Sequence, residues 1–317
     1  MFGLFRPAPL GVDLGTGSVK VIGLNGKKIS LAAFMDIPSS DWEEEALLIN
    51  RLQNFFKEIN IDGKDAVVHM PGHLSFVRTI NLPPMPKGEL KEAVKWEIKR
   101  QLPYPQEEAV YDYIAAPAAD GIVVTFASAE RKNVQRYISP FKEASLKVVA
   151  VDVNPLCLIR ALPLHGSGNI IVLDIGARSM EIDIMRSESV RLTRTVDLGG
   201  EQIKNQLISE GFPEGAIDDI MMAGPAERMK EVLNQFLREI FLSIDYYKAT
   251  FKEKVFSEVI LTGGVAINHA VRDYFSQILD IPVGVPNPFD NLIMKDESLR
   301  PLGPRFSVAI GLAKRAS

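Results

Sequence analysis

The residues best suited to chemistry near the N-terminus form a glycine-rich turn. The turn, Asp13-Leu-Gly-Thr-Gly-Ser18, leads into alternating apolar residues at positions 19, 21 and 24, which predicts a strand–turn–strand hairpin. Backbone N–H groups of such a hairpin point into one concavity that suits a phosphate. The candidate phosphate contacts are Asp13, Gly15, Thr16, Gly17, Ser18 and Lys20.

Each side chain of the turn has a role in such a site. Thr16 and Ser18 supply hydroxyl donors, and Lys20, on the face of Ser18, reaches a phosphate oxygen. Asp13 suits Mg²⁺, which keeps several waters and takes few carboxylates. The segment matches neither a Walker loop nor a dinucleotide fingerprint, since Lys20 stands where a third glycine would open a helix. Taken alone, the turn fits a purely structural hairpin equally well.

A second copy of the turn, Asp174-Ile-Gly-Ala-Arg-Ser179, lies near the middle of the chain. Three of its residues match the first copy at the same spacing: Asp174 with Asp13, Gly176 with Gly15, and Ser179 with Ser18. The separation is too long for a solenoid repeat and fits a duplicated, two-lobed fold. Asp13 and Asp174 then face one metal–phosphate group across a cleft, and they are the candidate Mg²⁺ ligands, through water.

Two glycine pairs in the second half of the chain add further candidates. One pair precedes Glu201 and opens a helix predicted over 202–209, whose free N–H groups suit a phosphate. The other pair follows the strand that ends at Thr262, and it allows the backbone to lie against a flat ligand such as adenosine; a plain strand-to-helix turn is the alternative. The added nucleotide contacts are Asp174, Gly176, Ser179, Gly199, Gly200, Glu201, Gly263 and Gly264.

The elements that position these turns are visible in the hydrophobic pattern. A proline-rich break at 82–87 precedes a predicted helix that two prolines end after residue 102. Strands predicted at 109–115 and 121–127 and a helix at 131–143 complete a small inserted subdomain. A longer amphipathic helix over 228–251 presents one apolar stripe, which predicts core packing. That stripe consists of Met229, Val232, Phe236, Ile240, Ile244 and Tyr247.

Composition excludes several classes of protein. The 317 residues carry 36 Lys and Arg against 40 Asp and Glu, a net charge of −4 that disfavours a nucleic-acid groove. The single cysteine forms no internal disulfide, and His69 and His73 form no helical metal pair because a proline and a glycine separate them. No apolar run reaches the roughly 18 residues of a membrane span. We expect a soluble, cytoplasmic protein.

The order of the glycine motifs carries a resemblance. Two D-x-G hairpins followed by G-G-E and T-G-G resemble the actin-like nucleotide-binding fold of actin, the chaperone ATPases, sugar kinases and the cell-division protein FtsA. Further segments resemble the FtsA-related PilM family of type IV pilus assembly proteins: 82–113, 149–162, 197–204, 238–247 and 286–289. The resemblance runs from residue 10 nearly to the C-terminus.

The resemblance implies an α/β fold of the actin-like, duplicated ribonuclease H-like type. Two lobes would enclose a nucleotide, and lobe I would carry an FtsA-type inserted α+β subdomain. The implied bounds are 1–81 and 147–168 for the lobe I core, 82–146 for the insertion, 169–300 for lobe II, and 301–317 for a C-terminal helix that returns to lobe I.

The resemblance also implies cofactors and partners. ATP or ADP with Mg²⁺ would contact the candidate residues, and the protein would sit at the inner face of the cytoplasmic membrane, which it reaches only through partners. It would bind the cytoplasmic N-terminal tail of PilN beside the insertion. It would thereby link the platform and motor proteins of the pilus to the alignment complex, with no nucleic-acid partner.

Two departures from the resemblance bear on catalysis. Relatives often place Glu where this chain has Asn154 before a proline, and Arg178 stands where a small residue is usual. An uncharged amide is no general base, so we expect weak or absent ATP hydrolysis and assign no catalytic residue. Two alternatives remain: a small-molecule kinase of the same fold, and an FtsA-like filament protein. FtsA ends in a membrane helix, whereas this sequence stops after a predicted core helix.

Overall fold

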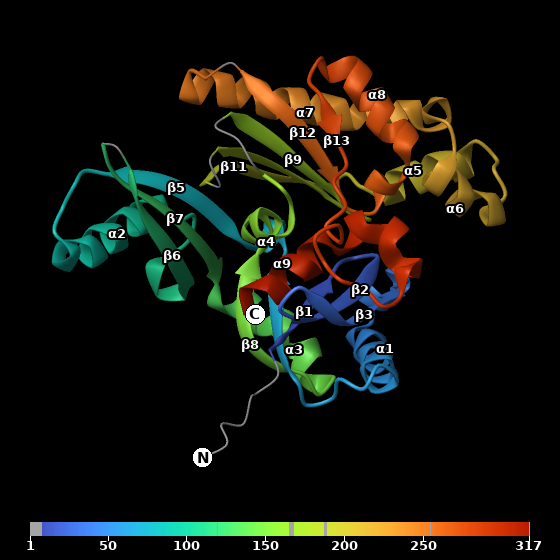
Figure 1. Ribbon diagram of the computed structural model, residues 1–317, viewed down its shortest axis with the longest axis horizontal. Helices are drawn as coiled ribbons and strands as arrows, with labels where there is room; N and C mark the ends of the chain where they lie inside the picture. The colour runs from blue at the N-terminus through green and yellow to red at the C-terminus, as the bar shows by residue number, and fades with distance from the viewer. Residues whose placement is uncertain (1–7, 119, 165–167, 187–188, 254, 317) are drawn as a thin grey trace.

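The computed structural model describes residues 8–118, 120–164, 168–186, 189–253 and 255–316. Residues 1–7, which the expected lobe I includes, lie outside this range. Two five-stranded sheets and one three-stranded sheet form the framework (Figure 1). The first sheet has the order β3 (Lys28–Asp36), β2 (Ser18–Asn25), β1 (Leu10–Leu14), β4 (Asp65–Met70) and β8 (Lys147–Val153). The second has β11 (Ser189–Val196), β10 (Met180–Arg186), β9 (Asn169–Ile175), β12 (Phe256–Thr262) and β13 (Val283–Gly284).

The two larger sheets have the same topology. In each, a central strand pairs antiparallel with the next strand of a meander on one side and parallel with a crossover strand on the other. The outer strands repeat the pattern. Strands β3 and β11 pair antiparallel with β2 and β10, and strands β8 and β13 pair parallel with β4 and β12. The duplication predicted from the paired turns is thus present in the strand order itself.

Lobe I is built on the first sheet, whose central strand β1 is buried along its whole length. Helices α1 (Glu45–Glu58) and α3 (Arg131–Glu143) supply Phe56 and Phe141 to the core on one face. Helix α9 (Ser307–Ala316) covers the other face. Because both faces are covered, every residue of β1 is buried, including Asp13.

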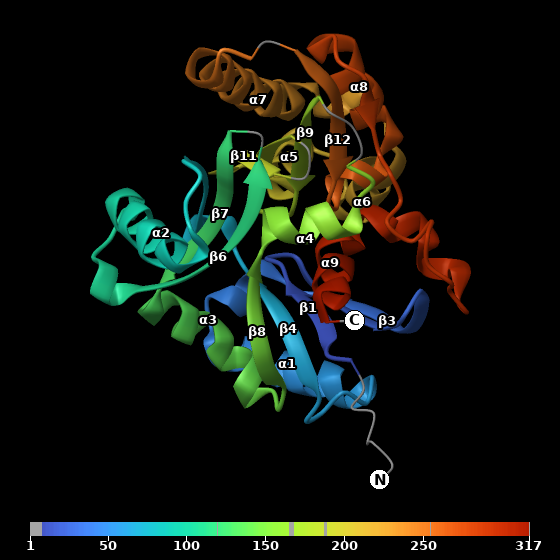
Figure 2. The ribbon, with the colours of Figure 1, turned by 60° about the vertical axis from the view of Figure 1, so that its left-hand side comes forward.

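Helices α4 (Asn154–Ala161) and α9 lie between the two large sheets (Figures 1 and 2). They form one apolar cluster with residues of both sheets, including Ile22 of β2 and Val172 of β9. Glycines permit this close packing, since a Cβ atom on Gly11 would collide with the carbonyl oxygen of Ala309. The lobes therefore share a continuous apolar core.

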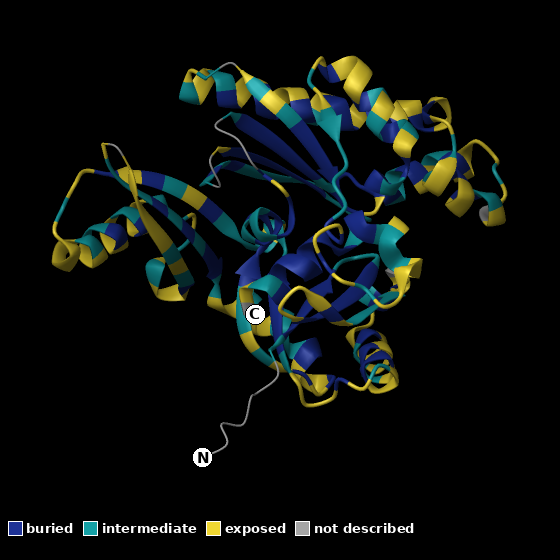
Figure 3. Cartoon of the chain, viewed as in Figure 1, coloured by how far each residue is buried: buried dark blue, intermediate teal, exposed yellow. Residues whose placement is uncertain are grey.

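Lobe II covers its sheet with α7 (Lys230–Phe251), α8 (His269–Leu279), α5 (Gly200–Ser209) and α6 (Glu214–Ala223). The apolar stripe predicted on α7 is buried against the sheet, as expected. The opposite face of α7 is largely exposed (Figure 3). Helix α7 ends at Lys252, whose left-handed φ of 56° closes the helix.

The three-stranded sheet, in the order β5 (Phe76–Leu82), β7 (Gly121–Glu130) and β6 (Ala109–Ala118), packs on α2 (Lys87–Gln101). Its bounds differ from the expected 82–146. Strand β5 precedes the proline break yet pairs with β7 along its full length. Helix α3 contributes Phe141 to the lobe I core. The three-stranded sheet with α2 thus occupies residues 76–130, and the domain bounds expected from the sequence stay a prediction.

Short 3₁₀ helices connect these elements: η1 (Ser39–Trp42), η2 (Gly72–Leu74), η3 (Gln106–Glu108), η4 (Ala226–Met229), η5 (Val265–Ile267) and η6 (Glu297–Phe306). Within the described ranges, no helix combines the length and the apolar character needed to cross a bilayer.

Candidate nucleotide-binding cleft

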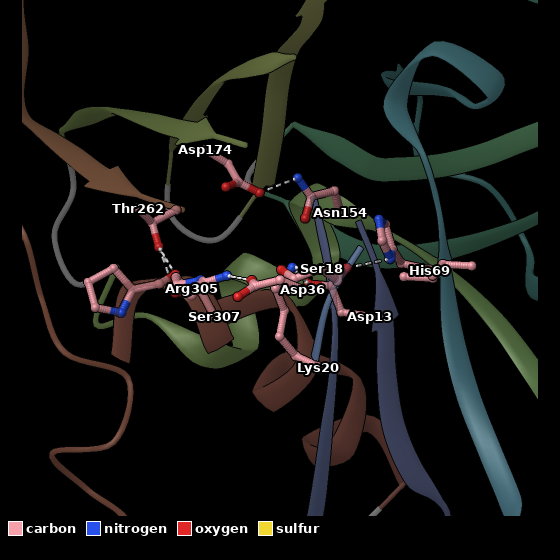
Figure 4. A network of polar contacts seen from close by, with 12 residues as sticks. Asp13, Ser18, Lys20, Asp36, His69, Asn154, Asp174, Thr262, Arg305 and Ser307 are labelled. Atoms are coloured by element: carbon pink, nitrogen blue, oxygen red, sulfur yellow. Dashed lines mark hydrogen bonds and ion pairs between the residues drawn. The ribbon is translucent and has the colours of Figure 1, made fainter. Parts of the chain in front are cut away.

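The first hairpin carries a buried ion pair. Asp13 near the end of β1 lies opposite Lys20 on β2, and Lys20 Nζ donates to Asp13 Oδ2 at 3.0 Å (Figure 4). His69 Nδ1 on β4 lies 3.4 Å from Asp13 Oδ1. Burial lowers the pKa of His69, and the nearby Asp13 carboxylate only partly opposes this. The imidazole is therefore neutral at neutral pH, and Lys20 is the charged partner of Asp13 among the residues that the structure describes.

Two aromatic side chains hold the backbone of this turn. Trp42 Nε1 donates to the carbonyl oxygen of Thr16 at 2.8 Å, and the Tyr137 hydroxyl donates to that of Leu14 at 3.0 Å. The amide of Gly15 donates to the Ser18 carbonyl at 3.0 Å and closes the turn. Neither aromatic residue was a sequence candidate, because each contacts the turn from a distant segment.

The second hairpin repeats this turn with different side chains. The Gly176 amide donates to the Ser179 carbonyl at 2.9 Å, as in the first copy. Asp174, however, lies opposite Glu181 on β10, where the first hairpin has its lysine. Asn154 Nδ2 at the start of α4 donates to Asp174 Oδ2 at 2.9 Å (Figure 4). Burial raises the pKa of Asp174, and this hydrogen bond opposes the rise.

Glu181 and Asp183 form a buried acidic pair on β10 that sequence reasoning missed. Burial raises the pKa of Glu181 well above its usual value, and the charge of Asp183 adds to the rise. Burial likewise raises the pKa of Asp183 to about 7, against a smaller opposite effect of its cross-strand neighbour Thr193. The sequence did contain a signal for this pair, because two acidic residues alternate with apolar ones in this strand. Glu181 also touches lobe I, because a Cβ atom on Gly72 would collide with its carboxylate.

The four predicted motifs meet at one place. A Cβ atom on Gly17 would lie 2.7 Å from Ala177 Cβ, so the two hairpins are in contact. Gly263, at φ 86°, lies against Asp174, since its Cβ would be 2.5 Å from Asp174 Oδ1. Gly199 packs on the backbone of Ala177 in the same way. Gly264 is the exception, because a Cβ atom there would meet open space.

Two predicted nucleotide contacts at the start of α5 use their backbone amides within the protein. The amides of Gly200 and Glu201 donate to the carbonyls of Gly176 and Ala177 at 2.9 and 2.8 Å. These two amides therefore support the second hairpin. The sequence had suggested that they are free for a phosphate, and here they are not. Arg178 Nε also lies 3.1 Å from Glu201 Oε1, which ties this hairpin to α5 by an ion pair.

The residues present fit a nucleotide phosphate chemically. The first turn contains the hydroxyl residues Thr16 and Ser18, and the ammonium group of Lys20 lies against it, 3.0 Å from where a Cβ atom on Gly15 would stand. No three His, Cys, Asp or Glu side chains of the described residues are grouped as a metal site, so Mg²⁺ would depend on few carboxylates, water and phosphate. Gly17 lies against Ala177, so the two turns touch at this point. A phosphate between them requires the hairpins to separate.

Among relatives of known sequence, cell division protein FtsA of Neisseria meningitidis serogroup B (strain ATCC BAA-335 / MC58) is 25% identical over 229 residues. That match covers 61% of this chain and 53% of the relative, so the chain spans about half the length of the curated relative it matches.

Solved structures resemble the whole chain. A PilM–PilN type IV pilus biogenesis complex matches with a TM-score of 0.81 and 23% identity over 98% of this chain and 99% of that one. The ethanolamine utilization protein EutJ of Carboxydothermus hydrogenoformans matches with 0.61 and 16% over 98% and 90%. ADP-bound MreB5 of Spiroplasma citri matches with 0.54 and 12% over 97% and 95%. The fold is therefore the expected actin-like one. The family model described as type IV pilus assembly protein PilM matches residues 11–317, and the chain belongs to this family.

Proposed function

We propose that this chain is a nucleotide-binding component of the type IV pilus assembly machinery that binds the cytoplasmic N-terminal tail of a PilN-like membrane protein. The observation that carries the proposal is the PilM family match over nearly the whole chain. The likeness to a PilM–PilN complex supports the choice of partner. In this role the protein acts at the inner face of the cytoplasmic membrane, held there by partners, and links platform or motor proteins to the alignment complex.

The inserted subdomain offers a place for such a tail. A groove of about 470 Å³ runs along α2 and is lined by Glu92, Lys95, Trp96, Lys99, Gln106 and Glu107. Trp96 is 64% exposed, and Lys99 Nζ lies 5.7 Å from its ring centroid. A large exposed indole beside two ammonium groups suits an apolar side chain and a carboxylate of a bound peptide.

We also propose that ATP or ADP binds with Mg²⁺ between the two hairpins, so that residues of both lobes contact the phosphates and the metal ion. Thr16 and Ser18 would donate hydrogen bonds to phosphate oxygens, and Lys20 would offset their charge. Asp13 and Asp174 would hold the hydrated ion. Asn154 bonds to Asp174 and carries no basic group, so nothing at this position removes a proton from water. We therefore expect slow turnover at most.

The nucleotide proposal is tested by thermal unfolding with and without Mg-ATP. Ligand that binds only the folded chain raises the melting temperature with concentration. Asp13→Ala is expected to abolish the shift and Thr16→Ala to reduce it, whereas Asp219→Ala, on the exposed side of α6, keeps it. Thr16→Ala serves as the second variant because Asp13 is buried beside Lys20. An unchanged melting temperature across millimolar ATP would contradict nucleotide binding.

The partner proposal is tested by binding of a synthetic PilN-like N-terminal peptide to the full chain. We expect a dissociation constant in the micromolar class. Trp96→Ala is expected to weaken binding, while Ile208→Ala, an exposed apolar change on α5, leaves it unchanged. Failure of the peptide to bind the folded protein would refute the partner. Unaltered binding by Trp96→Ala would refute only the groove.

A further inference from the structure

The outer face of α7 carries an apolar patch that no described element covers. Its inner face packs in the lobe II core, but Phe241, Leu242 and Tyr246 are 39%, 53% and 52% exposed. Ile278 of α8, 46% exposed, lies beside them along a shallow groove of about 370 Å³. We call Arg238, Phe241, Leu242, Asp245 and Tyr246 the α7 patch.

The charges of the α7 patch are arranged symmetrically. Arg238 and Asp245 are exposed and lie two helical turns apart, about 10.5 Å along the axis. Phe241 and Leu242 occupy the midpoint between them. Within the described residues, neither Arg238 nor Asp245 has an ion-pair partner. The two charges therefore stand at equal distances from an apolar centre, with opposite signs.

A second pair of opposite charges is placed symmetrically about the same apolar centre. Glu231 in the first turn of α7 and Lys252 at its C-cap are both exposed. They too lie at equal distances from the midpoint between Phe241 and Leu242. Along the chain, the N-terminal half of the outer face thus carries an acid and then a base, Glu231 and Arg238. The C-terminal half repeats this order with Asp245 and Lys252.

This pattern matches itself when the helix is turned end over end. A two-fold axis through the midpoint sets a second α7 antiparallel to the first, so that Arg238 faces Asp245 of the other copy. Glu231 then faces Lys252 of the other copy, and Phe241 packs against Leu242 of the other copy beside the axis. A parallel arrangement would place like charges opposite each other, which is unfavourable. Of these two arrangements, the antiparallel one pairs all four of these charges with opposite signs.

We propose that the α7 patch is a self-association surface whose occupant is a second copy of this chain, bound through a two-fold axis. Such an isologous contact uses the same surface on both copies and closes without further growth. One exposed helix face with an apolar centre and charged ends has the size of a weak, transient interface. The inference is independent of the nucleotide and of the PilN-like tail, because the patch lies on the outer side of lobe II.

Charge reversal on the full chain tests the proposal. Sedimentation over a range of concentrations is expected to show a monomer–dimer equilibrium. Arg238→Asp places acid against Asp245 of the other copy and is expected to raise the dissociation constant about tenfold or more. The double variant Arg238→Asp/Asp245→Arg restores the pairing in exchanged positions and should recover the dimer. A monomer at every concentration, or a dimer that Arg238→Asp leaves intact, would overturn the proposal.

Cross-linking gives a second readout that does not depend on affinity. Leu242→Cys places a thiol beside the axis, where a short bifunctional maleimide should join two copies. The native Cys157 is fully buried and does not compete. Ile208→Cys, with 44% exposure on α5, is the matched control and should remain monomeric. Equal cross-linking of the two variants would also overturn the proposal.

Discussion

Asp183 should make the stability of this protein fall as the pH rises toward neutrality. Its side chain is fully buried, and neither carboxylate oxygen has a hydrogen bond within the described chain. Burial raises the pKa of Asp183 from 3.8 to about 7. The folded chain therefore holds a proton between about pH 4 and 7 that the unfolded chain has released. Stability is lost with rising pH across this window, and the loss is complete above it.

The size of the effect follows from the shift. About three pKa units at about 1.4 kcal/mol each give up to about 4 kcal/mol of unfolding free energy between pH 4 and 8. Asp183→Asn resembles the protonated acid in shape and cannot ionise, so this slope should vanish. The change also removes the charge that helps to raise the pKa of Glu181, which flattens the profile further.

The assay is urea unfolding of wild type and Asp183→Asn at several pH values. The quantity compared is how the difference in unfolding free energy between the two proteins changes with pH. A pH-independent cost of burying the amide therefore cancels. We expect the variant to gain stability relative to wild type as the pH rises from 4 to 8, with no further gain above it. Parallel profiles would refute the reasoning. Glu181→Gln, compared in the same way, tests the argument if Asp183→Asn does not fold.

The remaining predictions concern the cleft. Gly17→Ala brings a Cβ atom 2.7 Å from Ala177 and should cost about 1–3 kcal/mol in chemical unfolding, whereas Gly264→Ala enters open space and should stay within about 0.5 kcal/mol. Equal effects of the two changes would contradict the hairpin contact. Asp13→Asn leaves the buried Lys20 unpaired and should cost about 3–5 kcal/mol, and adding Lys20→Met should recover much of that loss. A double variant no more stable than the single one would show that the ion pair is not the cause.

The local elements were predictable because their signals are local. Alternating apolar residues around glycine turns predicted both hairpins, and the stripe on α7 predicted its buried face. The start of the three-stranded sheet was not predictable, because β5 belongs to this sheet only through its pairing with β7. Likewise, nothing in the sequence around Trp42 or Tyr137 indicates that each donates to the first turn. Such contacts depend on how distant elements pack.

The two hairpins of the duplicated fold carry different charges at equivalent positions. The strand register places Lys20 opposite Asp13 and Glu181 opposite Asp174, at equivalent positions of the two copies. One copy thus holds a compensated ion pair, and the other a buried pair of acids whose pKa values are raised. Adding phosphate charge costs less beside Lys20 than beside Glu181, because opposite charges attract in a poorly solvated site. We therefore expect the first hairpin to hold the phosphates, and the second to respond to them through the metal and through Asn154.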